Sequence, residues 1–318
     1  MWSFSVSKGL HCTVENRGLL RRKAPRNDKR RIFFFGLVVL IGCVSPPAKL
    51  PPQAPIRTLA EGKILAALDT YGQDLERLSA SGTVRLRLPF EEAERSLDAS
   101  LAASKPGRLR FSARDVFEKR MDLLSAGGEF FLLVNAPGEK KIFRGKAEEV
   151  SRRADFPLGP ELIIESLGMG PIHRPEEARA IFEKYPETYV VTFVLPSQSG
   201  VRLFKKVWMD RRTLRIVRMQ TFLATGDIFA DVFLDDFQSA GNIELARRIR
   251  IEWPFEGSFL DLKLKSLKAN PALPEKLWEF QIPKGYEIVP VEGPTGSTGK
   301  VLPSREGNTS GDAATPPN

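Results

Sequence analysis

The hexapeptide Thr83-Val-Arg-Leu-Arg-Leu88 sets the pattern that governs most of the chain. Apolar and polar residues alternate along it, so its three aliphatic side chains share one face of an extended segment and its two arginines share the other. This period of two predicts a strand with one buried side and one solvated side.

Eleven further segments are predicted to be strands, because each alternates in the same way or is apolar throughout. They cover residues 97–101, 109–113, 121–126, 129–135, 141–144, 188–195, 203–210, 214–223, 228–237, 247–253 and 258–267. Connections such as Asp210-Arg-Arg-Thr213 are of hairpin length, which favours antiparallel neighbours. The expected fold class is mainly β (α+β), a strongly curved antiparallel half-barrel sheet of about eleven to twelve strands, because so long a twisted sheet must curl.

A few helices are expected to cap this sheet. Residues 57–78 place apolar side chains at helical spacing, although two glycines weaken the pattern. Residues 159–167 carry a proline in the first turn and residues 175–183 carry acidic side chains there, and both features favour helix starts. Residues 274–278 are predicted to form one more short helix.

The concave apolar face of such a sheet must be filled by side chains, by helices or by a ligand. Nine side chains on the predicted apolar faces are candidates to line a ligand cavity: Val84, Leu86, Leu109, Phe111, Leu132, Val191, Phe193, Phe222 and Phe233. Plain packing of the same residues against the helices is the alternative, and the sequence leaves both open.

A second informative stretch is Arg30-Arg-Ile-Phe-Phe-Phe-Gly-Leu-Val-Val-Leu-Ile-Gly-Cys43, which ends a basic region. A basic region, a short apolar core and small residues at a cleavage site are typical of a secretory signal peptide. The apolar run is too short for a membrane-spanning helix, which needs about 20 residues.

The last four residues of this stretch, Leu40-Ile-Gly-Cys43, resemble the lipobox of bacterial lipoproteins. The resemblance implies that cleavage precedes Cys43, that a diacylglyceryl group joins its sulfur, and that the new amine receives a fatty acid such as palmitate. A signal peptide with an incidental cysteine, or a buried strand, is the alternative. The proline-rich segment from Val44 to Pro55 is then a semi-rigid tether that holds a folded domain off a bilayer.

The predicted organisation has four parts: residues 1–42 as a signal peptide with an N-terminal extension, 43–56 as a proline-rich tether, 57–292 as the folded domain and 293–318 as a disordered tail. The extension before the signal is unusually long. It suggests that translation starts later, near Val14 or Leu19, and a genuine long cytoplasmic extension is the alternative. The mass of the unprocessed precursor would distinguish the two.

The net charge of +9 is unevenly distributed along the chain. Residues 1–42 contain nine of the 48 Lys and Arg residues but two of the 39 Asp and Glu residues, so the mature chain is nearly neutral. It therefore gives no indication of nucleic-acid binding. The two cysteines are Cys12, in the segment to be removed, and Cys43, so the mature domain is expected to depend on its core for stability.

No enzyme, cofactor or metal site is recognisable, because nucleophile-elbow, dinucleotide-binding and Cys/His metal motifs do not occur. His173 lies between two nearby prolines and is expected to be a solvated loop residue. Asp231 and Asp235 share one predicted strand face, where solvated acids are expected rather than a cation site. The chain is therefore expected not to be an enzyme.

The C-terminal half carries a resemblance to a known family. The segments concerned are, in order, Trp208 to Arg218, the hairpin at Gly226-Asp227, Arg247-Arg-Ile-Arg-Ile251, Asn270-Pro271, Trp278-Glu-Phe280 and Ile282-Pro-Lys-Gly285. In this order they resemble the LolA- and LolB-like proteins of the lipoprotein-localisation family, and the resemblance extends over about residues 59–289.

This resemblance implies a half-open curved sheet closed by helices over a hydrophobic cavity. The family's carrier holds lipoprotein acyl chains in the periplasm, and its receptor is itself lipidated in the outer membrane. Val44 rather than Asp follows Cys43, which the family's sorting rule associates with the outer membrane. The receptor's exposed apolar loop residue has its nearest counterpart in Leu88-Pro-Phe90, which the acidic Glu91-Glu-Ala-Glu94 follows.

The leading hypothesis is an outer-membrane-anchored periplasmic lipoprotein whose cavity binds an acyl chain or a lipidated protein, in lipoprotein or lipid transfer or in envelope biogenesis. The alternative is a non-enzymatic envelope interaction or sensor module that binds a protein partner with the same scaffold. A dry cavity lined by the nine residues favours the first hypothesis. A filled core with an exposed apolar patch favours the second. The sequence indicates neither the ligand nor the oligomeric state.

Overall fold

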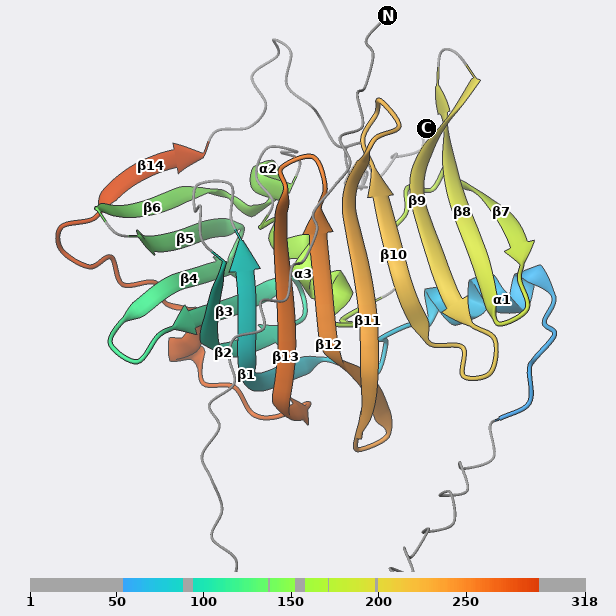
Figure 1. The fold of residues 1–318 in the computed structure, drawn as a ribbon, viewed down its shortest axis with the longest axis horizontal. Coiled ribbons are helices and arrows are strands. Elements are labelled where there is room, and N and C mark those ends of the chain that lie inside the picture. The colour runs from blue at the N-terminus through green and yellow to red at the C-terminus, as the bar shows by residue number, and fades with distance from the viewer. Residues whose placement is uncertain are drawn as a thin grey trace, which may run out of the picture. The chain divides into compact units, whose positions relative to one another are not determined.

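The computed structural model describes residues 54–87, 94–136, 138–151, 158–170, 172–197 and 200–291. Within them the chain forms one 14-stranded sheet and a few short helices (Figure 1). Cys43, the loop Leu88-Pro-Phe90 and the predicted tail at 293–318 lie outside the described residues.

The strands follow one another across the sheet in the order β14-β6-β5-β4-β3-β2-β1-β13-β12-β11-β10-β9-β8-β7. Their bounds are β1 (Arg77–Arg87), β2 (Arg95–Ser104), β3 (Arg108–Arg114), β4 (Lys119–Ala126), β5 (Glu129–Ala136), β6 (Glu139–Lys146), β7 (Arg179–Lys184), β8 (Thr188–Ser197), β9 (Gly200–Asp210), β10 (Ile216–Phe222), β11 (Ile228–Ala240), β12 (Ile243–Trp253), β13 (Ser258–Ala269) and β14 (Glu287–Val291). Strands β14 and β7 form the two edges, so the sheet is curved but unclosed (Figure 1).

Most neighbouring strands are consecutive in the sequence and antiparallel, as the hairpin-length connections predict. The pairing of β1 with β13 joins the two halves of the sheet, and β14 pairs with β6 in parallel. Asn270 secures the central joint in a left-handed conformation (φ 52°). Its Oδ1 accepts hydrogen bonds from the backbone N–H groups of Glu76 (2.8 Å) and Arg77 (3.0 Å), and its Nδ2 donates to the carbonyl of Asp74 (2.9 Å).

The mainly β class is confirmed, but the sheet has 14 strands rather than the eleven to twelve predicted. One of the additional strands, β7, occupies residues predicted to be helical. The Ala178 N–H donates to the Pro175 carbonyl and closes a turn. After it, Ala180 and Phe182 pack against the core, while Ile181 between them is exposed. This period of two outweighs the acidic residues that favoured a helix start. The other additional strand, β14, tolerates Pro290 because it is an edge strand.

The helices are α1 (Glu61–Asp69), α2 (Ala147–Ser151), α3 (Pro160–Ser166) and the 3-10 helix η1 (Glu275–Trp278). Helix α1 ends before the predicted limit because Gly72 adopts a positive φ of 68°, and a Cβ there would lie 2.0 Å from the carbonyl oxygen of Gly168. The turns after α1 and α3 therefore touch through glycine backbone. Among the described residues, no helix combines the length and the apolar character needed to cross a bilayer.

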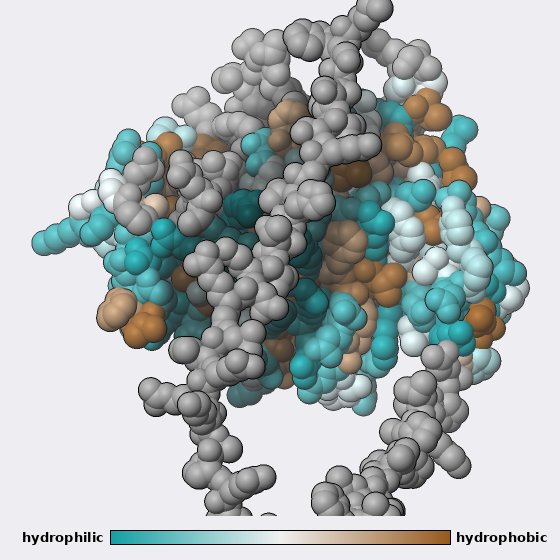
Figure 2. All heavy atoms as spheres, viewed as in Figure 1, coloured by the Kyte–Doolittle hydropathy of each residue, from teal (hydrophilic) through white to brown (hydrophobic). Residues whose placement is uncertain are grey.

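One face of the sheet and the helices enclose a single hydrophobic core. Ile64 and Leu68 of α1, Val150 of α2 and Ile163 of α3 belong to the same buried cluster as the apolar side chains of the strands. In Figure 1, α1 and α3 lie behind the sheet, so the apolar face is the far face in this view. The strand side chains that alternate with these core residues point away from the helices, towards the viewer. Figure 2 shows hydrophilic side chains over much of this near face.

Residues 274–286, here called the strap, cross the polar face of β3, β4 and β5 before β14 begins. Both carboxylate oxygens of Glu275 accept from Arg108 at 2.9 Å, and the ring of Phe280 stacks on Phe131 with centroids 4.8 Å apart. Arg110 donates to the carbonyl of Glu279 (2.9 Å). These contacts hold the strap against the sheet.

Candidate functional site

The predicted cavity lining is largely brought together on the apolar face. Seven of the nine candidates are members of the core cluster: Val84, Leu86, Leu109, Phe111, Leu132, Val191 and Phe193. Each is at most 3% exposed, so almost none of their surface can touch a water molecule. The space between these strands and the helices is therefore filled in this structure, and their role in ligand binding stays a prediction.

The other two candidates lie elsewhere, which corrects the predicted lining. Phe233 of β11 is half-buried on the polar face, where the guanidinium of Arg218 lies 4.9 Å from its ring centre. Its neighbours Val232 and Leu234 take the core positions, so the strand period places Phe233 opposite to the prediction. Phe222 is buried but is not a member of the core cluster, because it follows a register irregularity at the end of β10.

Helices α1, α2 and α3 form a cover over the apolar face of the sheet. A buried ion pair connects this cover to the sheet. Lys205 of β9 stands opposite Phe193 of β8, and its side chain is 3% exposed. Its Nζ lies 2.5 Å and 2.8 Å from the two carboxylate oxygens of Glu165 in α3. Removing two charges from water is costly, and only close pairing offsets the cost. The pair therefore acts as a polar clasp between α3 and the sheet.

Two further groups surround this clasp. The backbone N–H of His173 donates to Glu165 (2.9 Å), and the His173 ring meets Phe204 edge-on at 6.1 Å. His173 is thus half-buried beside the cover rather than the solvated loop residue expected from the sequence. Burial raises the pKa of the Tyr71 hydroxyl, and the negative charge of Glu165 adds to the increase.

The apolar face also contains a hydrogen-bond donor without an acceptor. Trp253, at the end of β12, is completely buried in the core cluster, and its indole Nε1–H donates to no residue of the described ranges. A buried donor left unpaired costs about 1–3 kcal/mol. An oxygen atom brought in by a ligand would remove this cost.

The acidic residues of β11 do not form an open cation site. Asp231 is buried and accepts from Arg218 at 2.8 Å and 2.6 Å and from Gln220 at 2.8 Å. No group of three or more His, Cys, Asp or Glu side chains with metal-binding geometry occurs in the described part of the chain. Asp231 is therefore a structural ion-pair partner, not the solvated acid that the sequence suggested.

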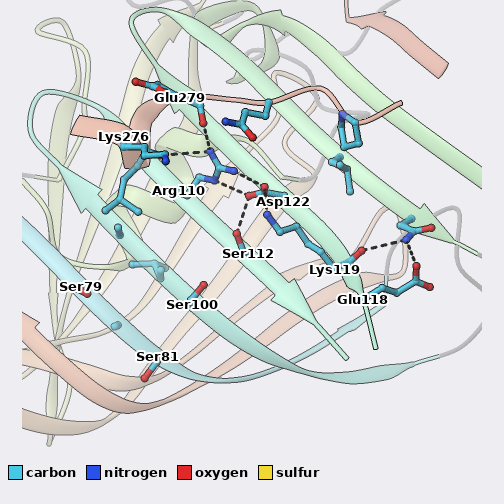
Figure 3. Close-up of a pocket in the computed structure, with 18 of the residues that line it drawn as sticks. Ser79, Ser81, Ser100, Arg110, Ser112, Glu118, Lys119, Asp122, Lys276 and Glu279 are labelled. Carbon is cyan, nitrogen blue, oxygen red and sulfur yellow. Dashed lines mark hydrogen bonds and ion pairs between the residues drawn. The ribbon is translucent and has the colours of Figure 1, made fainter. Parts of the chain in front are cut away.

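A pocket of about 990 Å³ lies on the polar face, between the strap and strands β1–β5 and β13 (Figure 3). None of the nine predicted residues lines it. Its floor is a row of hydroxyl side chains at matching register on four strands: Ser266 of β13, Ser81 of β1, Ser100 of β2 and Ser112 of β3. We call this pocket the serine groove.

The row of serines ends at a carboxylate that is already neutralised. Asp122 of β4 accepts from Arg110 at 2.7 Å and 2.5 Å, from Ser112 at 2.8 Å and from Lys119 at 2.6 Å. Its side chain is 4% exposed. Asp122 and its partners therefore brace one end of the groove, and its charge is not available to a ligand.

Two groups of exposed apolar side chains lie outside this groove. Val116 and Phe117, between β3 and β4, are 86% and 93% exposed. Their turn is fixed by Asp115, whose Oδ1 accepts from the N–H groups of Phe117 and Glu118 at 2.8 Å each. These bonds and the ion pair with Arg120 lower the pKa of Asp115 to about 2.

The second exposed apolar group lies beside edge strand β7. Ile181 of β7 and Val201 and Leu203 of β9 are exposed on the polar side of the sheet. We call these three residues the edge patch. Its position next to an unpaired strand edge makes it accessible to another chain.

Sequence reasoning missed the clasp, the serine groove and the exposed pair Val116–Phe117. Lys205 takes the place of an apolar residue in the alternating series Leu203, Val207 and Met209, and this break in the pattern indicates a buried charge. The serines did alternate with core residues, for example Ser100 beside Leu101, but the sequence does not show that the strap forms a wall above them.

Comparison with known proteins gives a likeness of fold only. No protein-family model matches the chain. No curated protein matches it in sequence. Similar solved structures include a LolA superfamily protein from Nitrosomonas europaea, with a TM-score of 0.45 and 15% identity over 70% of this chain and 99% of that chain.

Two more solved structures are similar to the same extent. A DUF1329 family protein from Desulfovibrio piger has a TM-score of 0.46 and 13% identity, over 68% of this chain and 95% of that chain. An outer membrane lipoprotein-sorting protein domain from Vibrio parahaemolyticus has a TM-score of 0.43 and 12% identity, over 68% and 94%. LolA-like proteins, the family of the sequence resemblance, are thus among the structural neighbours at low sequence identity.

Proposed function

We propose that the chain is a non-enzymatic, lipid-anchored protein of the cell envelope that holds an apolar chain between its sheet and helices α1 and α3. The ligand class is an acyl chain of a lipid or of a lipoprotein. The observation that carries the proposal is the cover of the apolar face. Three short helices cover it, α3 has only seven residues, and displacing them breaks no strand pairing.

The polar groups under this cover support a reversible closure. A core that never opens gains nothing from a buried ion pair, because apolar residues of similar volume are often at least as stabilising. The Lys205–Glu165 clasp closes α3 on β9, and its charges regain water when α3 moves away. The unpaired indole N–H of Trp253 provides a donor for an ester or carboxyl oxygen of the ligand.

Uptake requires the cover to move, because the apolar space is filled in this structure. An acyl chain that replaces helix side chains against the sheet gains about 0.8 kcal/mol for each methylene it buries. A long chain therefore offsets the loss of the α3 contacts, and release follows when the cover closes again.

The remaining parts of the proposal concern the membrane. Cys43 is proposed to receive the lipid anchor and Val44 to direct the protein to the outer membrane, facing the periplasm. Two or more acyl chains make attachment stable. The exposed pair Val116–Phe117 is proposed to touch the bilayer while a ligand is transferred, the role for which Leu88-Pro-Phe90 is the nearest counterpart in the sequence.

Two experiments test the proposal. Full-length protein made in bacteria fed labelled palmitate should carry the label, and Cys43→Ser should not. Palmitate binding to the purified protein, followed by displacement of a fluorescent fatty acid, should be at least tenfold weaker in Phe193→Trp, which overfills the apolar face. Phe233→Trp, on the polar face, is the matched control. Equal palmitate affinity for both variants, or absence of binding by the parent, would refute the proposed ligand site.

A second candidate function is partner binding, because the core is filled and the edge patch is exposed. In this function a protein partner adds a strand to β7, and another part of the same partner packs over Ile181 and over Leu203, which lies two strands further into the sheet. Site-specific photo-crosslinking from position 203 in cells would give a discrete adduct that Ile181→Lys abolishes. Palmitate binding that is unchanged by Ile181→Lys separates this function from the first.

A further inference from the structure

We propose that the serine groove binds an anionic oligosaccharide, a chain of sugars that carry carboxylate or phosphate groups. The groove lies on the polar face of the sheet, so this inference does not depend on the acyl-binding proposal for the other face.

The floor of the groove offers hydroxyl groups that have no other partner. Ser79, Ser81, Ser100 and Ser266 line the groove, and their side chains form no hydrogen bond with any part of the described chain. Figure 3 shows Ser79, Ser81 and Ser100 on the floor without a dashed line, in contrast to Ser112. A serine hydroxyl both donates and accepts. An array of such groups matches a ligand whose own groups do both, as sugar hydroxyls do.

The spacing of the row fits an extended chain of sugars. Ser266, Ser81, Ser100 and Ser112 are direct neighbours across four adjacent strands. Adjacent strands lie about 4.7–4.9 Å apart, so the row spans about 14 Å. Each interval is close to the length of one pyranose unit in an extended glycan. A chain lying across the strands would therefore place one sugar over each serine interval.

The charges of the groove select for an anionic ligand. Lys268, opposite Ser79, and Lys276, in the strap, both line the groove and form no ion pair within the described ranges. The acidic residues nearest the floor are already engaged, Asp122 by Arg110 and Lys119 and Glu118 by Arg120. Glu279 contributes one further negative charge at the rim. The ammonium groups of two lysines thus remain for the ligand.

The strap forms the wall of the groove, and its contacts hold it in place against the sheet. The strap is fastened by Glu275 to Arg108, by the carbonyl of Glu279 to Arg110, and by the Phe280–Phe131 stack. Small side chains on the floor, including Ala102 beside the serines, keep the pocket open beneath it. A preformed site of about 990 Å³ loses little conformational entropy on binding.

Isothermal titration of the full-length protein tests the inference with tetragalacturonate as the anionic glycan, cellotetraose as the neutral one and inorganic phosphate as the free anion. We expect tetragalacturonate to bind at least tenfold more tightly than either of the others at low salt. Lys268→Gln and Lys276→Gln should each weaken it about two- to fivefold, the range for exposed ion pairs. Lys265→Gln, on the same strand but outside the groove, is the charge-matched control.

The serine row is tested separately by Ser100→Val, with Ser96→Val on the same face of β2 as its control. We expect only the first to weaken tetragalacturonate binding, with urea unfolding curves of both variants showing that the fold is kept. Equal binding of cellotetraose would refute the anionic character, and equal binding of inorganic phosphate would refute the sugar. Absence of tetragalacturonate binding, or an unchanged affinity in the Lys268→Gln/Lys276→Gln double variant, would refute the site.

Discussion

Removing one partner of the clasp should destabilise the protein more than removing both. In Glu165→Leu the ammonium of Lys205 stays 3% exposed on the apolar face, without the carboxylate that lies 2.5 Å from it in the parent. In the Glu165→Leu/Lys205→Met double variant both charges are replaced by apolar side chains of similar length. The comparison therefore separates the cost of an unpaired charge from the net contribution of the pair.

The magnitudes follow from burial. Leaving one charge of a buried pair uncompensated costs about 3–5 kcal/mol, whereas apolar replacement of both is often neutral or stabilising by about 1–4 kcal/mol. The double variant also loses the hydrogen bond from His173 N–H to Glu165, which contributes about 0.5–1.5 kcal/mol. We therefore expect Glu165→Leu to lose about 3–5 kcal/mol and the double variant to stay near the parent.

Urea unfolding followed by tryptophan fluorescence measures these differences. In thermal unfolding, the melting temperature of Glu165→Leu should be roughly 6–20 °C below that of the parent, because a domain of this size shifts by about 2–4 °C per kcal/mol. Lys206→Met is the control, because Lys206 pairs with Glu183 at 3.5 Å near the surface and such a pair contributes at most about 1 kcal/mol. Its unfolding curve should nearly coincide with that of the parent.

Two outcomes would contradict the reasoning. If Glu165→Leu unfolds within 1 kcal/mol of the parent, Lys205 has reached water or another partner and the clasp is not a buried pair. If the double variant is as unstable as the single one, the pair itself is a net source of stability. A cover that opens reversibly would then have no physical basis in the clasp.

Three more predictions concern other parts of the fold. Phe193→Ala should lose about 3–5 kcal/mol in urea unfolding because it leaves a core cavity, whereas Phe233→Ala on the half-buried polar side should lose clearly less. Asn270→Ala should lose about 1–3 kcal/mol, because two backbone donors at the start of β1 lose their acceptor and the alanine must hold a φ of 52°. The pKa of the Asp115 carboxylate is lowered to about 2, so its ionised form stabilises the turn fully when the pH is above the ordinary value of 3.8. This contribution should disappear only as the pH falls towards 2, and an NMR titration of the Phe117 amide would report the loss.

The period-two pattern allowed most of the sheet to be predicted, because burial on one face fixes which residues alternate. The twelve predicted strands all occur. The pattern failed where short elements depend on distant partners. Helix α1 stops early only because Gly72 meets Gly168, and β14 forms only because the edge of β6 is available to it. Neither contact is encoded within the segment concerned.

The candidate site was predictable to a lesser extent. Alternation placed seven cavity candidates on the core face, but it could not tell a packed core from an open one, because that depends on how closely α1 and α3 approach. It also placed Phe233 on the wrong face, although Asp231 and Asp235, two residues before and after it, already indicate the polar face of the strand. Asn270 belongs to the segments that carry the family resemblance, and in the structure its side chain bonds the backbone at the central joint.

The same strands supply both proposed sites through alternate residues, and this has a consequence for coupling. Phe111 faces the core while Ser112 faces the groove, and Leu101 and Ser100 divide in the same way. A ligand on one face can affect the other only by shifting the shared backbone, because helix α3, which is proposed to move, and the fastened strap lie on opposite faces of the sheet. Closely hydrogen-bonded strands resist such shifts. Acyl and glycan binding should therefore be independent, and by reciprocity any coupling seen in one direction must appear equally in the other.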